Sequence, residues 1–359
     1  MMKKFEHGGA VYRAAHEWGV DIDEVLDFSA NINPLVTVEL LNRWTAPYMK
    51  QILHYPDVEY HELKEAICNY HQTNREQLVL GNGATELIHA LIRYLKPKTA
   101  RLTAPTFGEY EKALCSVGAE IELIGTASEC LTVDLDRLFD DSEGVDVIFV
   151  CNPNNPTGKK ICTDALKEKM SILHKNTTCI IDEAFIDFTI EGEKNSVVDM
   201  LSQCPNVIIL RSATKFFGIP GLRLGYLMSD NQRLVESLTE TMPVWHINVL
   251  AAGVVIEGLK DKDFHDRTRR YVDTERKFIE KGLEGLGIHY YKSCVNYLLI
   301  KSPIRHPLDQ AMAPYKILVR SCENYNGIRE NIYRIAVRTR MENERLLFAL
   351  NRIMEETTC

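Results

Sequence analysis

Short apolar runs alternate with longer amphipathic stretches through the middle of the chain. The apolar runs are LVL (78–80), ARLTA (100–104), DVIFVC (146–151), TCIID (178–182) and NVIILR (206–211). Stretches with helical periodicity, such as 86–95 and 164–175, lie between several of them. Because parallel strands need long crossover connections, this alternation predicts an α/β fold with a mostly parallel sheet covered by helices. Functional groups are then expected at the carboxyl ends of the strands.

The pattern changes towards the carboxyl end. A charged helical region (261–287), strand-like segments (296–301, 317–321 and 333–339) and an amphipathic helix (342–356) follow one another there. This pattern predicts a small α+β domain over residues 251–359, and the large domain is then expected over residues 50–250. Residues 1–49 carry little strand signal, and we expect them to form an N-terminal arm and part of the small domain.

Composition and charge exclude several classes of protein. The 359 residues are 45% hydrophobic and 26% charged, as in a globular protein large enough for a sizeable core. The formal net charge of −8 gives no general basic field for nucleic acid or an anionic membrane. There is no run of eighteen apolar residues and no apolar signal core, so neither a membrane span nor secretion is expected. The ten cysteines lack metal-ligand spacing, which indicates reduced thiols of a cytoplasmic protein and no metal site.

Polar or aromatic groups follow the first three of these strands. GNGATE (81–86) combines two glycines with a helix start, so its N–H groups and the Thr85 hydroxyl can cradle an anion. In PTFGEY (105–110), the ring of Phe107 offers a flat face to a planar ligand, and in NPNNPTG (152–158), Asn155 offers a side-chain amide. Each stretch also has a structural interpretation: a capped turn, a core aromatic and a proline-punctuated turn.

The next two strand ends carry charge. Asp182 ends a buried strand, where a carboxylate must be paired with a salt-bridge partner or with a cationic ligand atom. Lys215 follows in SATK, where burial would lower its pKa and leave a neutral amine able to condense with an aldehyde. An ordinary surface lysine is the alternative. Pyridoxal 5'-phosphate needs all five groups, because it carries a phosphate, a flat ring, an oxygen on that ring, a ring nitrogen and an aldehyde.

Four of these motifs together resemble those of a known enzyme family. SATKFFGIPGLRLGY (212–226), NPNNPTG, DEAFIDF (182–188) and GNGATE are similar to the fold-type I pyridoxal-phosphate enzymes of the class I and II aminotransferase branch. The resemblance implies a large domain with a mostly parallel seven-stranded sheet, beside the small α+β domain. It also implies that Lys215 is the Schiff-base lysine, that Asp182 pairs with the ring nitrogen, and that Asn155 donates to the ring oxygen.

The resemblance extends to the rest of the cofactor site. The residues that it assigns to the cofactor, besides those three, are Gly83, Ala84, Thr85, Phe107, Ser212 and Arg223. HYPD (54–57) is similar to the motif whose tyrosine reaches the cofactor phosphate of the other subunit. Tyr55 therefore implies a homodimer with shared active sites, although an aromatic residue before a turn is its structural alternative.

The two ends of the chain resemble one group within this branch. HGG (7–9), LDFSANINPL (26–35), ILVRSCENYNGI (317–328), YRIAVRT (333–339) and NERLL (343–347) are similar to the threonine-phosphate decarboxylases of cobamide synthesis. The resemblance implies that the substrate meets His7, Gly8, Asn31, Asn155, Arg320 and Arg334. Two arginines, an imidazole and an amide suit a phosphomonoester with its three strong acceptor oxygens.

Three functions compete. Decarboxylation of threonine phosphate or serine phosphate is the first, histidinol-phosphate aminotransfer is the second, and non-catalytic binding is the third. The arginines suit both enzymes, whereas Phe185 stands where the aminotransferase relatives usually carry tyrosine. Val36 stands where the decarboxylases usually have glycine, so a different local loop is expected there. Lys215, Asp182 and Asn155 argue against a binding module, which has no need for a reactive amine.

Overall fold

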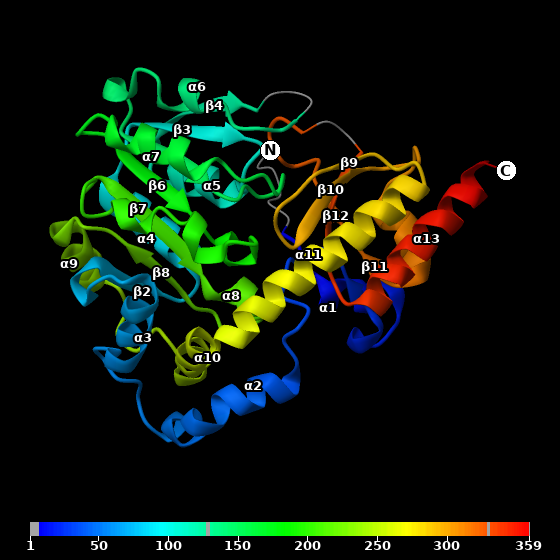
Figure 1. Ribbon diagram of the computed structural model, residues 1–359, viewed down its shortest axis with the longest axis horizontal. Coiled ribbons are helices and arrows are strands. Elements are labelled where there is room, and N and C mark those ends of the chain that lie inside the picture. The colour runs from blue at the N-terminus through cyan, green and yellow to red at the C-terminus, as the bar shows by residue number, and fades with distance from the viewer. Residues whose placement is uncertain (1–6, 127–129, 329–330, 359) are drawn as a thin grey trace.

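A seven-stranded sheet forms the centre of the larger part of the molecule (Figure 1). The computed structural model describes residues 7–126, 130–328 and 331–358. In spatial order, the strands are β2 (Leu78–Gly81), β8 (Gly225–Met228), β7 (Val207–Ser212), β6 (Thr178–Asp182), β5 (Val147–Cys151), β3 (Thr99–Ala104) and β4 (Glu120–Gly125). Strand β8 is antiparallel to both neighbours, and the pairs from β7 to β4 are parallel. The predicted α/β fold with a mostly parallel sheet is confirmed.

The central strands β5, β6 and β7 are buried at nearly every position because helices cover both faces of the sheet. Alternate residues of β5 enter two different cores: Val147 and Phe149 pack on one face, and Ile148 and Val150 pack on the other. The helices of this part are α3 (His61–His71), α4 (Ala84–Leu95), α5 (Gly108–Ser116), α6 (Leu135–Phe139), α7 (Thr163–Ser171), α8 (Ala213–Phe216), α9 (Gln232–Thr241) and α10 (Val249–Lys260). Two strands, β4 and β8, were not among the apolar runs singled out in the sequence, and β4 is mostly exposed.

A smaller α+β unit lies beside this sheet in Figure 1. Its antiparallel strands are β12 (Arg320–Ser321), β13 (Ile332–Ala336), β10 (Tyr297–Lys301) and β9 (Tyr290–Tyr291), in that order. Its helices are α11 (Lys262–Gly285), α12 (Leu308–Met312) and α13 (Arg340–Thr358). The single strand predicted over 317–321 divides into β11 (Ile317–Leu318), which pairs with β1 (Leu26–Asp27), and β12, which pairs with β13.

The first fifty residues contact both parts of the molecule. Helix α1 (Val11–Trp18) packs near β11 through a small apolar cluster that includes Leu318. Helix α2 (Val38–Thr45) and the 3-10 segment η2 (Ala46–Leu53) lie instead on α10 of the larger part. Segment η2 and helix α10 pack closely, since a Cβ on Gly253 of α10 would lie 2.4 Å from the ring of Tyr48 in η2.

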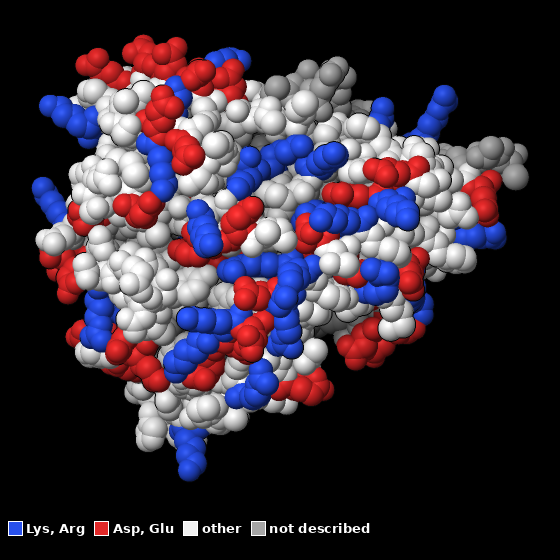
Figure 2. Space-filling model, in the orientation of Figure 1, with Lys and Arg blue, Asp and Glu red and all other residues white. Residues whose placement is uncertain are grey.

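The surface carries both signs of charge. Figure 2 shows lysine and arginine side chains interspersed with aspartate and glutamate side chains across this face. Such a mixture produces no extended single-sign field over the face shown. Among the residues that the structure describes, every helix is too short or too polar to cross a bilayer.

Candidate active site

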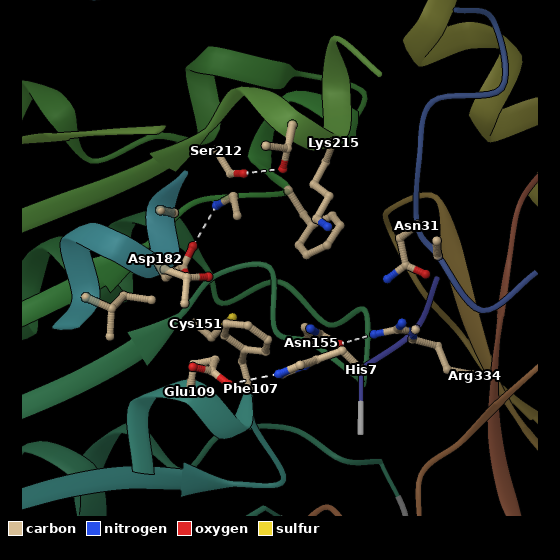
Figure 3. Close-up of a pocket in the computed structure, with 18 of the residues that line it drawn as sticks. His7, Asn31, Phe107, Glu109, Cys151, Asn155, Asp182, Ser212, Lys215 and Arg334 are labelled. Carbon is tan, nitrogen blue, oxygen red and sulfur yellow. Dashed lines mark hydrogen bonds and ion pairs between the residues drawn. The ribbon is translucent and has the colours of Figure 1, made fainter. Parts of the chain in front are cut away.

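A cavity of about 360 Å³ lies at the carboxyl ends of the central strands, next to the smaller unit (Figure 3). Of the residues singled out in the sequence, it is lined by His7, Gly8, Asn31, Ala84, Thr85, Phe107, Asn155, Asp182, Ser212, Lys215, Arg223, Arg320 and Arg334. Gly83 lies against the Arg223 side chain at its edge. Tyr55 lies elsewhere: it is 77% exposed, and its ring stacks on Trp245 with centroids 4.3 Å apart.

Lys215 stands on the one-turn helix α8, directly after β7. Its carbonyl oxygen accepts hydrogen bonds from the backbone N–H groups of Asn33 and Gly218, at 3.1 and 3.3 Å, which hold the turn in place. Burial lowers the pKa of the Lys215 amine to about 8, and the nearby charges of Arg334 and Arg223 contribute to this shift. A larger fraction of this amine than of an ordinary lysine is therefore neutral and nucleophilic near neutral pH.

Asp182 is a buried acid at the end of β6. Its Oδ2 accepts a hydrogen bond of 2.6 Å from Tyr110 Oη, and its Oδ1 accepts one of 2.9 Å from the Ala184 N–H. Burial raises the pKa of Asp182, while these two hydrogen bonds oppose the shift. Within the described part of the chain, Asp182 forms no salt bridge, so a cationic ring nitrogen would satisfy its charge.

Asn155 is held from the side of the smaller unit. Its Oδ1 accepts from Arg334 Nη1 at 2.6 Å and from Tyr325 Oη at 3.4 Å. This network assigns the oxygen to the protein and leaves Nδ2 as a donor for a ligand. Arg334 also donates from Nη2 to the Ser29 carbonyl oxygen at 2.7 Å. Two buried atoms of cavity-lining residues, Arg334 Nε and Asn31 Oδ1, have no partner among the described residues.

The start of α4 and the side chain of Arg223 form an anion site. Gly83 caps this helix with a φ of 90°, and a Cβ there would lie 2.4 Å from Arg223 Nη2. Glycine is therefore needed for the guanidinium to lie over the helix start. Ser212 Oγ and Thr214 Oγ1 lie 2.8 Å apart on the next turn and add hydroxyl groups. The residues present thus fit the phosphate, ring nitrogen and aldehyde of pyridoxal 5'-phosphate.

Comparison with known proteins agrees with this geometry. The aminotransferase class I and II family model matches residues 23–353. The chain belongs to this family. A threonine-phosphate decarboxylase from Salmonella typhimurium is 36% identical over 97% of this chain and 96% of its own length. The adenosylcobalamin biosynthesis bifunctional protein CobDQ of Leptospira interrogans is 30% identical over 98% of this chain and 41% of its own length.

A solved structure shows the same architecture. The histidinol-phosphate aminotransferase from Clostridium acetobutylicum superposes with a TM-score of 0.86 and 28% sequence identity, covering 92% of this chain and 100% of its own. Pyridoxal 5'-phosphate is the cofactor of enzymes in this aminotransferase family.

Two departures from the usual family pattern have structural consequences. Val36 does not adopt a left-handed backbone conformation, and it lies outside the residues that line the cavity. A Cβ on Gly218 would lie 2.6 Å from its Cβ, so Val36 packs on the turn after Lys215. Phe185 does line the cavity, and its ring meets that of Tyr297 edge-on at 5.0 Å.

Several lining residues were not identified from the sequence. They are Ser29, Ala30, Ile88, Glu109, Tyr110, Cys151, Ala184, Thr214 and Tyr325. Tyr110 could have been predicted from the sequence, because it stands three residues after Phe107, one turn along the same helix. Tyr325 carried none, since it lies in a loop of the smaller unit and reaches Asn155 only in the folded chain.

Tyr110→Phe is expected to lower kcat about tenfold while the fold is kept. The phenol donates to the buried carboxylate of Asp182, and a hydrogen bond to a charged group contributes about 1.5–3 kcal/mol. Without it, the pKa of Asp182 should rise further, and the acid should be ionised for less of the time. Steady-state kinetics between pH 6 and 9 would check this. A kcat equal to that of the wild type at every pH would contradict it.

Proposed function

We propose that this chain is a pyridoxal-phosphate-dependent decarboxylase of L-threonine O-3-phosphate or L-serine O-phosphate. It releases carbon dioxide in the cytoplasm and leaves an aminoalkyl phosphate for the nucleotide loop of cobamides. The names of the Salmonella and Leptospira relatives support this assignment. The observation that carries it is a cationic wall opposite Lys215, where Arg320 and Arg334 are 7% and 5% exposed.

The substrate-binding groups come from the smaller unit and the N-terminal arm. Arg320 donates from Nη1 to the Ser321 carbonyl oxygen at 2.5 Å and from Nη2 to Asn324 Oδ1 at 2.7 Å, which orients its planar guanidinium. A forked donor of this kind matches the oxygens of a phosphate or a carboxylate. His7, Gly8 and Asn31 complete this wall of the cavity in the proposed substrate site.

The large-domain groups serve the cofactor. When bound, pyridoxal phosphate supplies a ring that accepts the electron pair left when a bond to the substrate α-carbon breaks. Asp182 would pair with its ring nitrogen, Asn155 would donate to its ring oxygen, and Phe107 would pack against its ring. Gly83, Ala84, Thr85, Ser212 and Arg223 would hold its phosphate. Lys215 would hold its aldehyde carbon through the neutral amine and would act as the proton donor to the substrate α-carbon.

The choice of bond depends on how the chain holds the substrate. With the cofactor bound, the bond to be broken would be the one held perpendicular to its ring. Anchoring of the substrate phosphate by Arg320 and His7, with Arg334 and Asn31 beside them, would fix the rotation about the α-carbon and favour loss of the carboxylate. Phe185 has no hydroxyl group, whereas the aminotransferase relatives usually carry tyrosine at this position. This difference supports the decarboxylase over the aminotransferase.

Product analysis tests the proposal. The holoenzyme is incubated with O-phospho-L-threonine and O-phospho-L-serine in parallel, and carbon dioxide and the amine product are measured. A third reaction contains histidinol phosphate and 2-oxoglutarate. We expect carbon dioxide from at least one phosphorylated amino acid and no glutamate from the third mixture. If both substrates stay intact while histidinol phosphate is transaminated, the chain is an aminotransferase. The relative rates decide between the two phosphorylated substrates.

The proposed enzyme is a homodimer in which Tyr55 reaches the partner's cofactor phosphate. Met49, Ile52, Leu53 and Val58, which are close to this tyrosine in the sequence, are exposed apolar side chains, and exposed Trp245 stacks on its ring. We call these residues the patch; exposed apolar side chains gathered in one segment support a subunit interface here.

Leu53→Asp is expected to dissociate this dimer. The Leu53 side chain is 83% exposed in the single chain, so a charge there should cost little in the monomer and much in an apolar interface. Sedimentation velocity at micromolar concentration would show a shift from dimer to monomer. Ile172→Asp, at a 68% exposed position outside the patch, is the control and should remain dimeric. A Leu53→Asp protein that sediments like the wild type would contradict the proposed interface.

A further inference from the structure

Glu109 is a buried carboxylate in the wall of the cavity that has no role in the function proposed above. It lies in the first turn of α5 and is 3% exposed. Its Oε1 lies 2.8 Å from His7 Nε2 and 3.4 Å from Lys112 Nζ, and its Oε2 lies 3.1 Å from His89 Nε2. Burial would raise the pKa of Glu109, but the hydrogen bonds from His89 and His7 hold it below the ordinary value. Glu109 is therefore an anion at neutral pH.

An anion at this position is unfavourable for a phosphate ligand unless it serves another group. Glu109 lines the same cavity as Arg320, to which the proposed function assigns the substrate phosphate. Like charges repel more strongly in a partly dehydrated cavity than at an open surface. The contact with His7 offsets this repulsion, because the carboxylate then holds a side chain that binds the phosphate.

His7 links the N-terminal arm to the larger part of the molecule. Gly9 N–H donates to Ser29 Oγ at 2.8 Å, and a Cβ on Gly8 would lie 2.1 Å from the Ser29 carbonyl oxygen. These contacts fix the backbone next to His7, but they leave its side chain 49% exposed. Figure 3 shows this side chain extending to Glu109 beneath the cavity, and its ring centroid lies 5.8 Å from that of Phe107.

The geometry points to Glu109 as the positioning residue that holds His7 for the substrate phosphate, an inference that rests on the proposed function. With Nε2 turned to Glu109, the other ring nitrogen, Nδ1, has no hydrogen-bond partner among the described residues. Nδ1 donates to a phosphate oxygen when the ring carries both protons. His89 holds the second carboxylate oxygen, so the carboxylate cannot rotate away from His7. A ring held in advance loses less conformational freedom when the phosphate binds.

A double-mutant cycle on Glu109 and His7 tests this role in the holoenzyme. Glu109→Gln removes the charge and keeps the shape, and KM for O-phospho-L-threonine should rise about tenfold with kcat within about twofold. His7→Ala should raise KM similarly, and the double variant should be no worse than the single variants, because both act through one contact. Glu122→Gln is the control, since this carboxylate on β4 pairs with Arg101 outside the cavity and should leave both constants unchanged.

A second measurement does not depend on turnover. Calorimetric titration of the holoenzyme with 2-aminoethyl phosphate and with ethanolamine isolates the contribution of the phosphate to binding. Glu109→Gln should weaken affinity for the phosphate ligand about tenfold and leave ethanolamine binding unchanged. A wild-type protein that decarboxylates no phosphorylated amino acid would refute the proposed function, and this titration would still decide the role of Glu109.

Two outcomes overturn the inference. One is equal affinity for 2-aminoethyl phosphate in the wild type and in Glu109→Gln. The other is an additive effect of Glu109→Gln and His7→Ala on KM. If Glu109→Gln melts well below the wild type, Glu109→Asp replaces it, since aspartate keeps the negative charge but draws it back from His7 by one methylene. The same rise in KM is expected for Glu109→Asp, and an unchanged KM counts against the inference.

Discussion

Lys215→Ala is expected to reduce turnover at least about 1,000-fold while the cofactor stays bound. The variant loses both the covalent partner of the aldehyde and the proposed proton donor, and such groups contribute factors of about 10²–10⁴. The anion site at Gly83 and Arg223 remains, and so does the carboxylate of Asp182. Initial rates of carbon dioxide release measure the first effect. The visible absorption of the dialysed protein measures the second: a cofactor band should remain after dialysis and should be shifted from that of the wild type.

The control for this change is Lys301→Ala. Lys301 ends β10 and is exposed, so its removal deletes the same amine outside the cavity. This variant should keep wild-type rates and the wild-type spectrum. A Lys215→Ala protein with activity within about tenfold of the wild type would show that another group carries out the covalent step.

The pKa of Lys215 also makes the stability of the cofactor-free protein depend on pH. Folding lowers this pKa from 10.5 to about 8, so the unfolded chain binds more protons between these two values. The free energy of unfolding should therefore rise with pH from about 8 to about 10.5 through this group. Lys215→Ala should lack that part of the rise in denaturant titrations across this range.

Arg334→Ala is expected to lower kcat/KM about 100- to 1,000-fold and to change cofactor affinity less than about threefold. Truncating one member of a buried, hydrogen-bonded charged pair costs about 2–5 kcal/mol, or about 30- to 5,000-fold, and the expected loss lies within this range. Arg334 is 5% exposed and donates to Asn155 and to the Ser29 carbonyl oxygen, and its buried Nε has no hydrogen-bond partner among the described residues. Kinetics with the phosphorylated substrates and titration of the apoprotein with pyridoxal phosphate separate the two effects.

Arg345→Ala is the matched control for Arg334. Arg345 is an exposed arginine of α13 that does not line the cavity. Its removal changes the net charge equally and should alter neither constant. Equal losses of substrate turnover and cofactor affinity in Arg334→Ala would place this arginine in the cofactor site instead.

The sequence by itself determined the sheet and the groups at its strand ends. Continuous apolar runs such as 147–150 and 207–210 are the pattern of strands buried on both faces, and helical periodicity between them indicates parallel connections. Each parallel strand ends at the same edge of the sheet, so Asp182 and Lys215 could be expected to lie close together. Strands β4 and β8 were not apparent, β4 because it is largely exposed.

Only the tertiary structure decided which side chains meet across the cavity. Tyr110 supports Asp182, Arg334 orients Asn155, and Glu109 holds His7, over separations of 72, 179 and 102 residues. Sequence periodicity reports the local environment of a segment, whereas these contacts depend on strand order and on how the smaller unit packs against the sheet. The polar partner that satisfies a buried charge is a property of the assembled fold, so no single stretch of the chain contains it.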